Sequence, residues 1–90
     1  MNGETEPLIG QDVVVDTDCS MVYVGTLVAW EEYFVTLEGA DVHDLSSGTS
    51  TKDGYILAAR KHGVQRNRTR VQVRTAHVVS VSRLRDVMDF

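Results

Sequence analysis

Ninety residues are enough for one domain, and a hydrophobic content of 42% is too high for a disordered chain. The single cysteine, Cys19, excludes an internal disulfide, and no apolar run approaches the ~20 residues that a membrane-spanning helix needs. With no signal-peptide pattern at the start, these features predict a soluble protein of the reducing cytoplasm that has no membrane partner.

The net charge of −4 is distributed unevenly along the chain. Residues 1–53 carry eleven acids and one base, Lys52, whereas residues 54–85 carry eight bases and no acid. This asymmetry indicates either an anionic partner for the second half or neutralisation of one half by the other, within a subunit or between subunits. Both interpretations remain open from the charges alone.

The first third of the chain predicts two strands. The β-branched run Val13–Val15 predicts the first, which ends at the turn-forming residues 16–20. Residues 21–30 predict a central strand, because apolar side chains fall on both of its faces. Gly25 in the middle of this run predicts a sharp bend or a close backbone approach, as a small barrel requires.

A two-residue acidic turn, Glu31-Glu32, leads into a third predicted strand and so into a hairpin. Residues 33–37 carry the strand pattern and residues 39–40 interrupt it. Residues 41–45 are compatible with its continuation, and they are followed by a loop rich in serine, threonine and glycine.

Residues 52–63 carry the signals of a short helix. Ser50 or Thr51 is placed to cap its start, basic residues occupy its last turn, and Gly63 follows its end. The alternative is a strand through residues 55–57, and the helix is the favoured interpretation.

Two further strands are predicted by the alternation in residues 66–74 and 78–82. One face of the first carries Arg66, Arg68, Arg70, Gln72 and Arg74, and the other carries Asn67, Thr69, Val71 and Val73. In the second, Val79 and Val81 share one face, opposite Ser80 and Ser82. The sequence thus predicts a mainly β protein, a strongly bent five-stranded antiparallel small barrel with a short helix inserted before the fourth strand. Its one domain has a core of about residues 8–85 and tails at 1–7 and 86–90.

Two stretches of the chain resemble the signatures of the Sm/Sm-like (LSm) family. VQVRTAHVVSVS (71–82) is similar to the second signature, with Arg74 in the arginine position and Thr75 where the family usually has glycine. Gly10-x-x-Val13 followed by VYVGTL (22–27) is similar to the first. The chain is identified as a divergent member of the family. The resemblance implies a bent barrel that forms a homo-oligomeric ring through its fourth and fifth strands, with Val71, Val73, Val79 and Val81 at the interface.

The resemblance also implies an RNA site with an atypical base pocket. Arg74 and Thr75 would line it and Tyr33 would stack on a base, while Val35 replaces the asparagine that reads the base in the family. The arginine ladder gives independent support, because guanidinium groups at Arg66, Arg68 and Arg70 match the oxygens of a phosphate backbone. Tyr33 or Phe34 is suited to stack on a base.

The alternative is an Sm-like assembly or protein-interaction module without nucleic acid. Its arginines would pair with Glu38, Asp41 and Asp44, within the barrel or between subunits. Asp41-x-His43 resembles the beginning of a metal site, but without further ligands a solvated strand face is the favoured interpretation. No metal, cofactor or catalytic residue is predicted, and the protein is not expected to be an enzyme.

Overall fold

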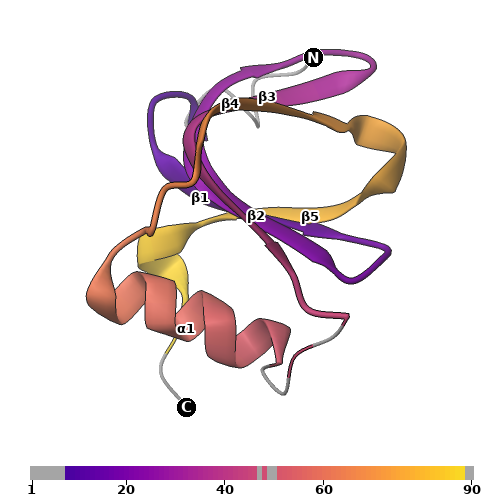
Figure 1. The fold of residues 1–90 in the computed structure, drawn as a ribbon. Helices are drawn as coiled ribbons and strands as arrows, with labels where there is room; N and C mark the ends of the chain where they lie inside the picture. The colour runs from indigo at the N-terminus through magenta and orange to yellow at the C-terminus, as the bar shows by residue number, and fades with distance from the viewer. Residues whose placement is uncertain (1–7, 47, 49–50, 89–90) are drawn as a thin grey trace.

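A computed structural model describes residues 8–46, 48 and 51–88 (Figure 1). The elements in chain order are β1 (Asp12–Thr17), β2 (Met21–Trp30), β3 (Phe34–Asp44), α1 (Lys52–His62), β4 (Arg68–Arg74) and β5 (Val78–Arg83). Two short 3₁₀ helices, η2 (Thr75–His77) and η3 (Leu84–Asp86), follow β4 and β5. In the described part of the chain, no helix has the length and apolar character that crossing a membrane demands. The predicted tail 1–7 lies outside the described residues.

The five strands form one antiparallel sheet in the order β4-β3-β2-β1-β5. The sheet curls strongly, so that β4 and β5 face each other across its concave side (Figure 1). The predicted barrel is not closed: among the described residues, β4 pairs only with β3 and β5 only with β1. The strand number and the antiparallel pairing are as predicted. The backbone groups of two edge strands therefore remain available for pairing.

The bend in β2 is centred on Gly25, as the sequence predicts. A Cβ at this position would lie 2.9 Å from the Cα and 3.0 Å from the Cβ of Ala40 on β3. The β2–β3 register shifts here, between Val24 and Thr26, which marks a bulge. Only glycine allows the two backbones to approach so closely, and the bulge turns the sheet upon itself.

Because β2 is buried on both faces, it contributes to two hydrophobic clusters. The first lies on the concave side of the sheet and contains Val13, Val15, Leu27, Val35, Leu37, Ala40 and Val73. The second lies between the sheet and α1 and contains Val14, Val22, Val24, Ala59 and Leu84. The apolar pattern of residues 21–30 is explained by this double contact.

The helix interpretation of residues 52–63 is confirmed. The Thr51 hydroxyl accepts a hydrogen bond from the Gly54 N–H at 3.0 Å, and Gly63 ends α1 with φ of 92°. The Lys52 ammonium donates to the Asp16 carboxylate at 2.7 Å and to the Thr17 carbonyl at 3.0 Å. These contacts fasten the start of α1 to the end of β1, and α1 lies below the sheet in Figure 1.

Three details of the strands differ from the prediction. β3 extends beyond residues 39–40, which form a bulge opposite Gly25, and the φ of 55° at Gly39 favours glycine. β4 begins at Arg68 rather than Arg66. Val79 does not share a face with Val81, because the β1–β5 register shifts beside it: Val81 packs against the first cluster, while Val79 is 63% exposed.

Candidate nucleic-acid interface

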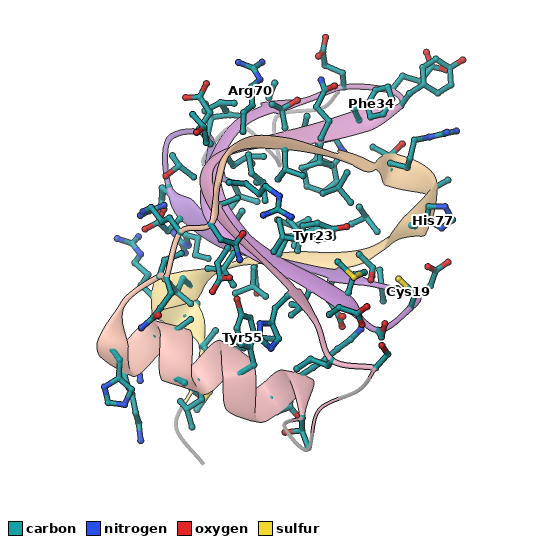
Figure 2. All side chains as sticks on the ribbon, in the orientation of Figure 1. Cys19, Tyr23, Phe34, Tyr55, Arg70 and His77 are labelled. Carbon is teal, nitrogen blue, oxygen red and sulfur yellow. The ribbon has the colours of Figure 1, made fainter. Side chains whose placement is uncertain are left out.

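Two exposed aromatic side chains and an arginine meet at the turn between β2 and β3. Phe34, the first residue of β3, pairs across the strands with Arg74, the last residue of β4. The Arg74 guanidinium carbon lies 5.8 Å from the centroid of the Phe34 ring, within the range of a cation–π contact. Tyr33 precedes Phe34 in the turn and is 63% exposed. The cation and the aromatic rings thus share one exposed end of the sheet, which Phe34 marks in Figure 2.

Thr75 fixes this end of the sheet. Its N–H donates to the Tyr33 carbonyl at 2.9 Å, and its hydroxyl donates to the Glu32 carbonyl at 2.6 Å. The β2–β3 turn and the β4–η2 junction are thereby joined, although they lie more than forty residues apart in sequence. A threonine in place of the family's glycine is thus explained locally, by a side-chain hydrogen bond to the turn.

The arginines of β4 lie on one exposed face, as the alternation predicts. Arg68, Arg70 and Arg74 are exposed, whereas Val73 between them is buried. Arg70 pairs with Glu38 on β3 at 3.1 Å, and both side chains are at least half exposed. An exposed pair of this kind contributes only about 0–1 kcal/mol, so a phosphate can compete for Arg70. The side chains of Arg70 and Phe34 both project outward from the top of the sheet in Figure 2.

Arg66 does not continue this row, which corrects the predicted ladder of four arginines on one strand. It precedes β4, and its guanidinium donates to the Gly39 carbonyl and to the Asp12 carboxylate, the latter at 3.2 Å. Gly39 leaves the space that this side chain fills, since a Cβ there would lie 2.9 Å from Arg66 Nη1. The charge of Arg66 is already matched within the protomer.

The four valines predicted at an oligomer interface lie in different environments. Val73 is buried in the first hydrophobic cluster, and Val71 and Val81 are half-buried against it. Val79 is exposed on the edge strand β5. The surface that the edge strands offer to a neighbour therefore consists mainly of backbone groups and Val79.

Asp41 and His43 do not form the solvated face that the sequence favours. Asp41 is only 5% exposed, and the His43 ring stacks on Tyr55 of α1 with centroids 4.4 Å apart. In the described part of the chain, no group of three or more His, Cys, Asp or Glu side chains is arranged to hold a metal ion. The sequence did not indicate the stacking of His43 on Tyr55, because Tyr55 lies twelve residues downstream, on α1.

Comparison with known proteins gives matches to solved structures only, since no protein-family model and no curated protein matches the sequence. The Sm protein of Pyrococcus abyssii, solved in complex with a uridine heptamer, is similar with 16% identity and a TM-score of 0.58, over 86% of this chain and 87% of that one. The SmAP (LSm) protein of Methanococcus vannielii has 19% identity and a TM-score of 0.56, over 91% and 99%. A chain of the NatC complex bound to CoA has 18% identity and a TM-score of 0.57, over 90% and 84%.

Proposed function

This chain has the Sm-like fold that its two signature stretches predict, and on that basis we propose that it is an RNA-binding protein. The proposed site is the exposed end of the sheet formed by Tyr33, Phe34, Arg74 and Thr75. A similar fold carries a uridine heptamer in the archaeal Sm protein.

The observation that carries the proposal is the contact between Phe34 and Arg74 beside the exposed Tyr33. Stacking of a base on an aromatic ring contributes about 1–3 kcal/mol and tolerates any base. The neighbouring guanidinium is placed to bind a phosphate of the same nucleotide. Because Val35 is fully buried and presents no hydrogen-bonding group, the site is expected to stack bases rather than to read their edges.

The phosphate backbone would continue along β4. Arg70 lies four residues before Arg74 on the same face, and Arg68 lies two residues before Arg70. Strand geometry separates alternate residues by about 7 Å, close to the spacing of phosphates in extended RNA. Arg66 was predicted to join them, but its pairing with Asp12 makes its contribution the smallest.

We further propose that the protomers form a homo-oligomeric ring. The edge strands β4 and β5 offer complementary backbone groups, and pairing between neighbouring protomers would cover both edges. Val79, exposed on β5, would then be covered by the neighbour, while Val71, Val73 and Val81 would support the edge strands from the core side.

An assembly module without RNA is the second candidate. It is favoured by the similarity to a chain of the NatC complex and by the Arg70–Glu38 pair, which already neutralises part of the basic face. An exposed apolar residue on an edge strand, Val79, suits a protein partner as well as a second copy.

Fluorescence anisotropy of short labelled RNAs, U-rich, A-rich and mixed, tests the two candidates against each other. The RNA proposal predicts binding at low salt that weakens at moderate salt and differs little between the U-rich and A-rich RNAs. Tyr33→Ala should weaken it, because a stacking surface is removed, while Tyr23→Phe should not, since Tyr23 packs against the core. Absence of binding at low salt, with an oligomer present by light scattering, would refute RNA binding and favour the assembly module.

A further inference from the structure

A cavity lies apart from the Tyr33–Arg74 end of the sheet. It opens between α1, the far end of β3 and the segment leading into β4. It encloses about 670 Å³, within the range of small-molecule sites. Its polar and charged lining comprises Asp41, His43, Tyr55, His62, Gln65, Arg66 and Asn67, and small residues of α1 form the opposite wall. Asp41 lies seven residues from Phe34, about 23 Å along an extended strand, so the two sites are separate.

The carboxylate of Asp41 lines this cavity, and the residue is only 5% exposed. One of its oxygens accepts a hydrogen bond from the Asn67 amide at 3.1 Å. The same Asn67 amide is held by the backbone of Val42, donating to its carbonyl at 3.1 Å and accepting from its N–H at 3.0 Å. A carboxylate offers about four lone pairs, so acceptor capacity remains after this bond and the one from the Tyr55 hydroxyl. The carboxylate is thus fixed in place and able to accept further hydrogen bonds.

An aromatic surface lies beside this carboxylate. The His43 and Tyr55 rings are stacked with 17° between their planes, and both line the cavity. The Tyr55 hydroxyl is buried and lies beside the Asp41 carboxylate. Burial first, and then its hydrogen bond to Asp41 and the charge of that carboxylate, raise the pKa of Tyr55, so this hydroxyl remains protonated. Tyr55 lies between α1 and the sheet in Figure 2.

We propose that this cavity binds a guanine base. Asp41 would accept hydrogen bonds from the two neighbouring N–H groups of the base, and an outer face of the stacked His43–Tyr55 pair would provide the stacking surface. Among the four RNA bases, only guanine presents two adjacent donors, N1–H and the N2 amino group, on its Watson–Crick edge. Adenine and cytosine place an acceptor beside their amino group, which would face the carboxylate unfavourably, and uracil offers one donor between two acceptors. A carboxylate therefore selects guanine, because its two oxygens can accept two parallel hydrogen bonds, as they do in bidentate pairs with arginine.

Isothermal titration calorimetry of the full chain with GMP, AMP and UMP tests this site directly. GMP is expected to bind with a saturable heat, and AMP and UMP at least about tenfold more weakly. A second arm compares binding of U-rich RNA with and without a single guanosine. Binding of free GMP identifies a nucleotide site, while a preference for the guanosine-containing RNA without GMP binding identifies a base site for RNA. Equal binding of GMP and AMP, or neither GMP binding nor a guanosine preference, overturns the proposal.

Variants locate the binding. Asp41→Asn should weaken GMP at least about tenfold, because an amide replaces one acceptor with a donor. Asp44→Asn is the matched control, the same change on β3 outside the cavity lining. Ala58→Phe fills the cavity from the exposed side of α1 and should block GMP without disturbing the core. Unchanged GMP affinity in Ala58→Phe would refute the location even if Asp41→Asn failed to fold. GMP binding uses neither Tyr33 nor Arg74, so it tests this proposal independently of RNA binding there.

Discussion

Replacing Arg74 by alanine should lower the salt dependence of RNA binding by about one third. The structure leaves three β4 arginines free of strong internal partners on one face, Arg68, Arg70 and Arg74, whereas Arg66 is held by Asp12. Each phosphate contact with a single strand contributes about −0.7 to the slope of log K against log salt. Three contacts per protomer give a slope of about −2, and the loss of one leaves about −1.4. For a fourfold rise in salt, these slopes correspond to affinity losses of about 18-fold and about 7-fold.

The assay is fluorescence anisotropy of a labelled U-rich RNA at several salt concentrations between about 50 and 200 mM. Arg60→Ala is the matched control, because it removes the same charge from α1, away from the proposed site. If several protomers of a ring contact one RNA, both slopes grow together and the fractional change remains one third. Equal reductions in Arg74→Ala and Arg60→Ala would refute the reasoning, since net charge alone would then account for the effect. An unchanged slope in Arg74→Ala would also refute it.

Three further predictions follow from single contacts. Gly25→Ala should destabilise the fold by about 1–3 kcal/mol in urea unfolding, since its Cβ would meet the backbone of Ala40 at 2.9 Å; an unchanged midpoint would contradict that approach. Glu38→Gln should raise RNA affinity by up to about fivefold in the anisotropy assay, because it frees Arg70 from its exposed pair, and the absence of any gain would indicate that Arg70 does not contact RNA. Thr51→Ala should cost about 1 kcal/mol in the same unfolding experiment, since the first turn of α1 loses its cap, whereas no loss would mean that the cap is dispensable.

The elements that the sequence predicted correctly are those whose signals are local. Alternation over residues 21–30 and 68–74 reports strand faces within each strand, and the cap and terminal glycine of α1 lie beside the helix that they delimit. Gly25 was also interpretable, because a glycine amid apolar strand residues has few other uses. The interruption of the pattern predicted at residues 39–40 corresponds to the bulge opposite Gly25, and the strand continues beyond it because glycine can take a positive φ there.

The candidate sites depended on contacts between distant segments. The pairing of Phe34 with Arg74 is set by the β3–β4 register, which no pattern within either strand specifies. The capture of Arg66 by Asp12 spans more than fifty residues. Asp41 was assigned to a solvated face because no further metal ligands are near it in the sequence, whereas its neighbours in the structure, Asn67 and Tyr55, come from later segments. Tyr33, Arg74 and Thr75 were placed together through the family resemblance, and the structure brings them to one end of the sheet.

The strand order has a consequence for synthesis on the ribosome. β1 lies between β2 and β5, so the second partner of the first strand is the last strand to be made. Leu84, which follows β5, also completes the second cluster, between the sheet and α1. A nascent chain can form the β1–β2–β3 meander early, but it exposes the edge of β1 until residues 78–84 have emerged. During that interval the β1 edge can recruit β5 from a chain on a neighbouring ribosome, so translation of clustered messages would favour strand-exchanged dimers.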